Sequence, residues 1–203
     1  MANRVRRCAI LVCTGTPTLN KYVCIQGVPL HGPYRRIIQQ EYDGLVATAK
    51  SRASVTPDWG FKGRWDGDED YYLEQRHIPG IAGEWYLRDL LPDAEAHANE
   101  LDRHDLVWKR QLIEVKTFGR RNSWCNFYQR DQGKFFDWLY VFMYDPDVRT
   151  IVCCGYIDRE KLTDKKNWSD QLPLVVGGTT GTTTGWRVPL KDLVPHGTGP
   201  LFN

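Results

Sequence analysis

The chain has 203 residues, enough for one domain with its own core but too few for two ordinary domains and a linker. Hydrophobic residues make up 41% and charged residues 26%, which is typical of a folded protein and excludes a disordered or fibrous chain. The formal net charge of +2 does not by itself indicate a nucleic-acid-binding protein, because evenly scattered charge would give the same total.

The apolar segments and the cysteines indicate where such a chain would reside. No apolar stretch approaches the roughly 18 to 20 residues that a membrane span requires. Six cysteines without Cys-x-x-Cys spacing indicate neither a disulfide framework nor a common zinc site. The basic N-terminus and the apolar run Cys8–Cys13 lack a convincing signal-peptide cleavage site. We therefore expect a cytoplasmic protein with most thiols in its core.

The first half of the chain mixes helical periodicity with irregular segments. The patterns predict an N-terminal arm or short strands over 1–33, an amphipathic helix from Tyr34 to about Ala53, an ordered loop over 55–72 and a helix from about Ile81 to Leu91. Gly44 interrupts the first helix, since glycine is a poor helix former. Glu84 lies close to the apolar side of the second helix.

The second half reads mainly as strands. We expect strands at 105–108 and 111–116, joined by the turn Lys109-Arg110, and then a helix over 126–137. A central strand Trp138–Tyr144, a strand over 149–157 and a capped helical turn over 158–162 should follow. The last expected elements are a mobile Gly/Thr-rich loop over 177–185 and a strand Trp186–Pro189. This order predicts one α/β (α+β) domain, with a mixed central sheet flanked by helices.

Glu114 and Lys116 carry the clearest chemical signal. Alternate residues of a strand share a face, so these two side chains point the same way while Val115 points to the packed side. The hairpin brings Asp105 beside them. Two carboxylates suit a hard cation such as Mg²⁺, which polarises a scissile phosphate and lowers the pKa of a bound water. Lys116 would hold the attacking water and offset the charge that develops on the phosphate.

Glu84, on the helix before the hairpin, is expected to complete the metal shell directly or through water. The expected catalytic residues are Asp105, Glu114, Lys116 and Glu84, and the expected metal site comprises Asp105, Glu114, Val115 and Glu84. The expected cofactor is Mg²⁺, for which Mn²⁺ would substitute.

Three segments, in this order, resemble the PD-(D/E)XK nuclease superfamily, whose members share the restriction-endonuclease-like fold. They are Gly80-Ile-Ala-Gly-Glu84 on a helix, then Asp105, then Glu114-Val-Lys116. The resemblance covers roughly residues 77 to 160 and includes the buried strand Trp138–Tyr144. It implies a restriction-endonuclease-like core and a Mg²⁺-dependent phosphodiesterase.

The resemblance also implies roles for single residues. It implies that Asp105 and Glu114 bind the metal, that Lys116 is catalytic and that Glu84 has an auxiliary metal role. One position departs from the pattern, because His104 rather than proline precedes Asp105. This departure leaves Asp102 as an alternative for the first carboxylate.

The expected substrate is DNA rather than RNA, since the superfamily mostly serves restriction, repair, recombination or phage replication. The resemblance also implies a phage or prokaryotic setting. A homodimer whose two sites address two strands would fit a single domain of this size. Salt-dependent contacts to the phosphate backbone are expected from Arg120, Arg121, Gln129, Arg130 and Lys134. Solvated surface charge explains these residues equally well.

Two other hypotheses remain open. The chain is a catalytically degenerate nucleic-acid-binding or protein-binding module of the same fold, or it is an interaction protein in which Glu-Val-Lys occurs by coincidence. A convergence of Asp105, Glu114 and Lys116 would favour the enzyme. A sheet that places Glu114 away from the helix carrying Glu84 would favour coincidence.

Overall fold

The structure, a computed structural model, describes residues 23–25, 28–30, 32–55, 73, 77–96, 104–119, 124–129, 135–176 and 179–202. Apart from its first residue, the loop expected over 55–72 lies outside these ranges. In the expected N-terminal arm, the described part forms a short antiparallel hairpin of β1 (Val23–Ile25) and β2 (Val28–Leu30).

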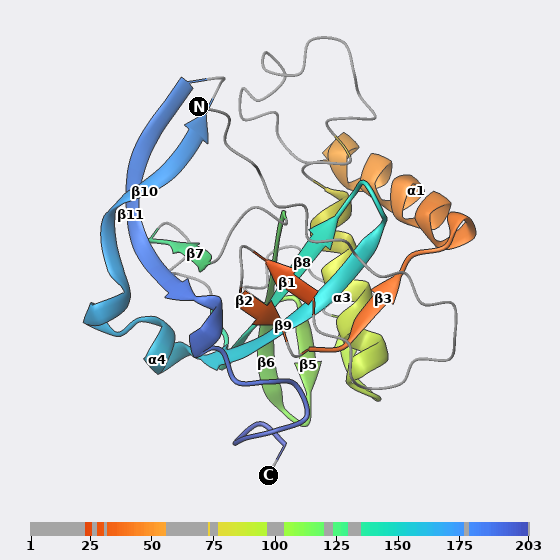
Figure 1. Cartoon of the computed structure of the whole chain (residues 1–203). Helices are drawn as coiled ribbons and strands as arrows, with labels where there is room; N and C mark the ends of the chain where they lie inside the picture. Colours follow the sequence, from red (N-terminus) through yellow and green to blue (C-terminus); the bar gives the residue numbers. More distant parts are fainter. Residues whose placement is uncertain are drawn as a thin grey trace, which may run out of the picture.

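A six-stranded mixed sheet forms the centre of the molecule (Figure 1), in the order β3-β9-β8-β6-β5-β4. Its strands are β3 (Tyr34–Arg36), β4 (Glu95–Ala96), β5 (Leu106–Trp108), β6 (Gln111–Gly119), β8 (Trp138–Asp145) and β9 (Thr150–Asp158). β6 and β8 run parallel, and the other neighbouring strands run antiparallel. β8 is buried along almost its whole length, as expected for a central strand covered on both faces.

Helix α3 (Ile78–Leu90) packs on one face of this sheet, and α1 (Gln39–Val55) packs against α3 on the same side of the molecule (Figure 1). α3 approaches β6 closely at Gly83, where an added Cβ would overlap Thr117 Oγ1 and lie 3.1 Å from Val115 Cγ1. Glycine therefore sets the distance between this helix and the strand. The buried side chains of this layer include Leu45, Ala49, Ile81, Leu87, Ile113, Val115, Phe142 and Tyr144.

A second, three-stranded antiparallel sheet covers the opposite face (Figure 1), in the order β10-β11-β7. Its strands are β7 (Trp124–Tyr128), β10 (Trp168–Val176) and β11 (Thr179–Pro189). Their inward side chains pack against β8 and β9 in a second apolar cluster, which includes Cys125, Phe127, Leu139, Val141, Met143, Trp186 and Val188. The central sheet is thus the middle layer of three.

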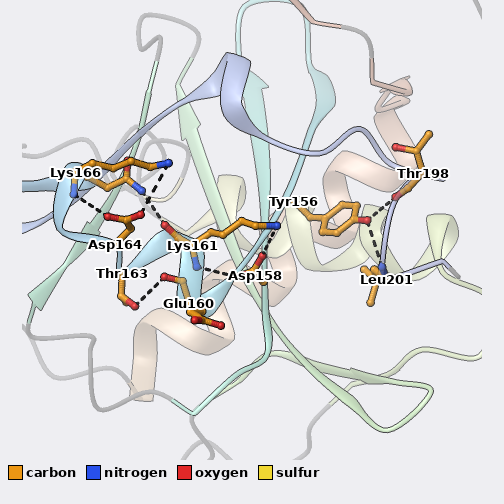
Figure 2. A network of polar contacts seen from close by, with 10 residues as sticks. Tyr156, Asp158, Glu160, Lys161, Thr163, Asp164, Lys166, Thr198 and Leu201 are labelled. Carbon is orange, nitrogen blue, oxygen red and sulfur yellow. Dashed lines mark hydrogen bonds and ion pairs between the residues drawn. The ribbon is translucent and has the colours of Figure 1, made fainter.

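Three short helical elements complete the described part: α4 (Arg159–Leu162), η3 (Lys165–Asn167) and η4 (Leu190–Asp192). The Asp158 carboxylate caps α4 by accepting a hydrogen bond from the Lys161 backbone N–H at 2.7 Å, and Asp164 accepts one from the Lys166 N–H at 3.0 Å (Figure 2). Both are standard N-cap contacts, and they fix the turn that leads from β9 into β10.

The segment after η4 runs back across β9. Val194 exchanges two backbone hydrogen bonds with Tyr156. The Tyr156 hydroxyl donates to the carbonyl of Thr198 (Figure 2). The ring of Phe202 lies 5.5 Å from that of Trp108, centre to centre, and so joins this segment to β5. Aromatic packing therefore connects residues from the end of the described chain to the β5–β6 hairpin.

The expected mixed α+β architecture is confirmed. The two strands of the hairpin, the central strand β8, strand β9, helix α3 and the capped turn α4 are in their predicted places. Three local predictions are wrong. Residues 34–36 form strand β3 instead of starting the first helix, because they pair with the edge of β9. Residues 124–128 form β7, where a helix was expected from 126, since Cys125 and Phe127 alternate into the core.

The Gly/Thr-rich segment is the third wrong prediction. From Thr179 onward it is strand β11, paired with β10 on one side and, at its end, with β7 on the other. Threonine is β-branched and fits a pleated strand, so pairing with β10 outweighs the local flexibility of glycine. The predicted strand Trp186–Pro189 is confirmed as the last part of β11.

Replacing Gly83 by alanine should destabilise the protein by about 1 to 3 kcal/mol, because the added methyl group must displace Thr117 or α3 in a packed interface. Urea denaturation measures this change in the free energy of unfolding. Gly80→Ala, in the same helix, is the matched control, since an added Cβ there meets nothing within 4 Å. Equal effects of the two substitutions would contradict the close approach of α3 to β6.

Candidate active site

The β5–β6 hairpin positions the predicted catalytic residues. Lys109 and Arg110 form its two-residue turn and have positive φ angles of 48° and 64°. This backbone conformation matches the twist of the strands that it joins. The turn fixes the register that pairs Leu106 with Ile113, so Asp105 lies beside the part of β6 that carries Glu114.

Glu114 and Lys116 form an ion pair, with 2.9 Å between Lys116 Nζ and Glu114 Oε1. Glu114 has 0% of its surface exposed, whereas the Lys116 side chain remains 30% exposed. Removing a carboxylate from water is costly unless positive charge and hydrogen bonds compensate it. The ammonium group of Lys116 therefore stabilises the buried charge and still reaches solvent.

The Asp105 carboxylate is bound to the backbone of β6, the strand that carries Glu114 and Lys116. Its Oδ2 accepts a hydrogen bond from the Val115 N–H at 2.7 Å, and the Asp105 N–H donates to the Ile113 carbonyl at 2.9 Å. The N–H and C=O of one strand residue point to the same side, so the Val115 carbonyl also leaves β6 toward Asp105. The structure thus holds the Asp105 carboxylate against the backbone of Val115, the residue between Glu114 and Lys116 on β6.

These groups fit a hard cation in their chemistry. Two carboxylates and a backbone carbonyl are oxygen donors, and Mg²⁺ usually takes only one or two protein carboxylates and keeps several waters. A cation would also offset the charge of the fully buried Glu114. Among the described residues, no group of three or more His, Cys, Asp or Glu side chains is arranged to hold a metal ion. The fit therefore depends on Asp105, Glu114 and the Val115 carbonyl.

Glu84 lies elsewhere. Both of its carboxylate oxygens accept hydrogen bonds from Arg52 on α1, at 2.8 and 2.6 Å. Its neighbour Gly83 faces Val115 and Thr117, which lie on the opposite face of β6 from Glu114. The structure does not bring Glu84 to Glu114, and this is the arrangement expected if Glu-Val-Lys were a coincidence.

Strand β7 forms a wall of the candidate site that the sequence did not reveal. The Phe127 ring centre lies 5.8 Å from Lys116 Nζ. Burial raises the pKa of the neighbouring Cys125 thiol to about 12, although the positive charge of Lys116 partly opposes this shift. Lys116 therefore lies between the two sheets, against an apolar surface. The alternation of Cys125 and Phe127 was the available signal for this strand.

The remaining predicted contacts are mostly outside the described part of the chain. This applies to Arg120, Arg121, Arg130 and Lys134, and to the alternative carboxylate Asp102. Gln129 is described: it is exposed at the end of β7, and its side-chain oxygen accepts a hydrogen bond from the Thr184 hydroxyl. The predicted DNA-binding role of these residues stays a prediction.

Comparison with known proteins does not assign the chain to a family. No family model matches it, and no curated protein shows significant similarity to it. Within the described ranges, no helix has both the length and the apolar character needed to cross a membrane.

Replacing Lys116 by methionine should destabilise the protein by about 1 to 3 kcal/mol, because the buried Glu114 loses its compensating charge. Breaking a buried pair costs about 3 to 5 kcal/mol, and partial exposure of Lys116 reduces that figure. Adding Glu114→Gln to this variant should recover part of the loss. Unfolding in urea of both single variants and the double variant measures the coupling, and strictly additive effects would contradict it.

Proposed function

We propose that the chain is a Mg²⁺-dependent nuclease that hydrolyses phosphodiester bonds in DNA. The observation that carries this proposal is the arrangement at β6, where Glu114 and Lys116 form an ion pair and the Asp105 carboxylate accepts a hydrogen bond from the N–H of Val115, the residue between them. Carboxylates and an ammonium group in one place match the needs of phosphoryl chemistry, which are metal binding and stabilisation of negative charge.

Each residue has a distinct task in this proposal. Asp105 is held in one orientation by its backbone hydrogen bond, and Glu114 is held by its pair with Lys116. A bound Mg²⁺ would polarise the phosphate and acidify a water, with Asp105, Glu114 and the Val115 carbonyl as its protein ligands. Lys116 reaches solvent and would orient the attacking water and offset charge on the phosphate. Glu84 has no direct role here.

The proposal that the substrate is DNA rests on the resemblance to the PD-(D/E)XK superfamily. The restriction-endonuclease-like core, the homodimer and the cytoplasmic phage or prokaryotic setting are proposed with it. The mixed sheet, the hairpin that carries Asp105 and the strand that carries Glu-Val-Lys are compatible with that resemblance. The enzyme would be an endo- or exodeoxyribonuclease. The products of the cleavage assay distinguish cutting within a strand from cutting at an end.

The burial of Glu114, which has no exposed surface, favours a second candidate function, a catalytically degenerate binding module. A substrate phosphate would need to approach through the Asp105 edge or displace β7. In this case the chain would bind DNA or protein without cutting it.

Lys116→Ala should lower the cleavage rate at least 100-fold, because positioned charge of this kind typically contributes about 10²- to 10³-fold. The assay uses linear, nicked, branched and single-stranded DNA with Mg²⁺, Mn²⁺ or EDTA. Lys191→Ala, an exposed lysine on η4, is the matched control and should cut like the wild type. Cleavage that persists in Lys116→Ala would overturn the assigned role of Lys116.

The same protein preparations separate the two candidate functions. Asp105→Asn should abolish metal-dependent cleavage and leave DNA affinity within about threefold, because Asp105 is proposed to bind metal and not the DNA backbone. Affinity is measured by fluorescence anisotropy at several salt concentrations. Salt-dependent binding without cleavage by the wild type, on every substrate and with either metal, would identify the binding module.

A further inference from the structure

Residues 193–202 lie as a strap over strand β9 of the central sheet. Val194 exchanges two backbone hydrogen bonds with Tyr156 of β9, at 2.8 and 2.9 Å. The Tyr156 hydroxyl donates to the Thr198 carbonyl and accepts a hydrogen bond from the Leu201 N–H at 3.4 Å (Figure 2). The strap is therefore attached to one residue of the sheet near both of its own ends.

Two glycines allow the strap to lie this close to β9. Gly155 of β9 has a φ angle of 123°, and an added Cβ there would lie 2.5 Å from the Val194 carbonyl oxygen. Gly199 of the strap has a φ angle of 76°, and an added Cβ there would lie 2.9 Å from the Tyr156 hydroxyl oxygen. Both backbone conformations favour glycine, and neither position has room for a side chain.

Aromatic rings fill the space beneath the strap. The rings of Tyr140 on β8 and Tyr156 on β9 stack at 5.3 Å, centre to centre, and both residues are fully buried. From the strap, the His196 ring lies 6.1 Å from that of Tyr140, and the Phe202 ring lies 5.9 Å from that of Tyr156. His196 and Phe202 also pack on each other at 5.1 Å. Part of the burial of the two tyrosines therefore comes from the strap.

One contact between polar side chains joins the strap to these rings. The Tyr140 hydroxyl lies 3.2 Å from His196 Nδ1. Burial raises the pKa of Tyr140 well above its usual value, so its hydroxyl keeps its proton and is a donor. A neutral imidazole has one nitrogen that accepts a hydrogen bond. Donation from Tyr140 to Nδ1 therefore assigns the proton of neutral His196 to Nε2.

The surroundings of His196 favour its neutral form. Burial lowers the pKa of His196. The titratable groups that face its ring and the rings beside it are the hydroxyls of Tyr140 and Tyr156, and burial raises the pKa of both, so neither is negatively charged. Lys161, which acts on Tyr156, is positively charged and is paired with Asp158 at 3.0 Å. The strap itself contains no Asp, Glu, Lys or Arg.

Protonation of His196 would disrupt its contact with Tyr140. Both ring nitrogens of a histidine cation carry hydrogen, so the Tyr140 hydroxyl would lose its acceptor. A buried donor without an acceptor is costly, and so is a charge that is removed from water without a partner. Opening of the strap would return both groups to water, and it therefore becomes more favourable once His196 takes up a proton.

We propose that residues 193–202 form a pH-sensitive strap, which lies closed on the sheet while His196 is neutral and loosens when His196 is protonated. Its contribution to stability is complete above about pH 6.5 and decreases as the pH falls below that value, because the open state takes up the proton first. Phe202 packs on Trp108 at 5.5 Å, so loosening also removes support from the hairpin that carries Asp105. The proposal does not depend on nuclease activity.

Amide hydrogen exchange of the full chain, followed by mass spectrometry, tests the proposal. After correction for the intrinsic pH dependence of exchange, exchange in residues 193–202 should increase about three- to tenfold between about pH 7.5 and about pH 5.5. Constant exchange would overturn the proposal. NMR titration of His196 in the same protein should give a pKa below the usual value of about 6.5, and a pKa at or above that value would also overturn it.

His196→Gln separates the strap from other effects of pH. Glutamine does not titrate, and its side-chain oxygen accepts hydrogen bonds, so exchange in the strap should stay close to its wild-type value at neutral pH and should not increase in acid. His77→Gln, at the start of α3, is the matched control and should keep the wild-type increase. Tyr140→Phe removes the donor that protonation leaves unpaired and should reduce the increase. A wild-type increase in His196→Gln or in Tyr140→Phe would contradict the proposal.

Discussion

The parallel pairing of β6 with β8 governs how the other layers are arranged. Parallel neighbours cannot be joined by a tight turn, so the chain must leave the sheet and return over a dozen or more residues. This connection spans residues 120–137 and contains β7, which lies on the face opposite α3. The crossover therefore supplies the first strand of the second sheet, and it covers the face on which Glu114 and Lys116 lie.

Alternation along β6 then sends successive residues into different environments. Val115 and Thr117 meet α3, while Glu114 and Lys116 meet the second sheet. Neither charged residue could move to the other face without a change of register, and the tight Lys109-Arg110 turn opposes such a change. Glu84, on α3, lies on the other side of the sheet from Glu114 and is paired with Arg52 of α1.

Local signals in the sequence were sufficient for the hairpin and the central strand. The apolar run that became β8 and the short turn at Lys109 determine their structures over a few residues. The second sheet was missed because its strands depend on partners far away: Trp186 pairs with Phe127 across almost 60 residues of chain. The partner of Glu84 could not be predicted from the sequence either. Helical periodicity shows which side of α3 is apolar, but it does not show that Arg52, 32 residues earlier, binds Glu84.

The contact between Phe202 and Trp108 has a consequence for biosynthesis. Phe202 packs on Trp108 and Tyr156, so the aromatic support of the β5–β6 hairpin includes a residue almost a hundred positions later in the chain. A nascent chain that has emerged only as far as β9 already has the strands of the hairpin but not this support. The hairpin that carries Asp105 therefore reaches its final packing only once Phe202, and with it the strands of both layers, has been synthesised.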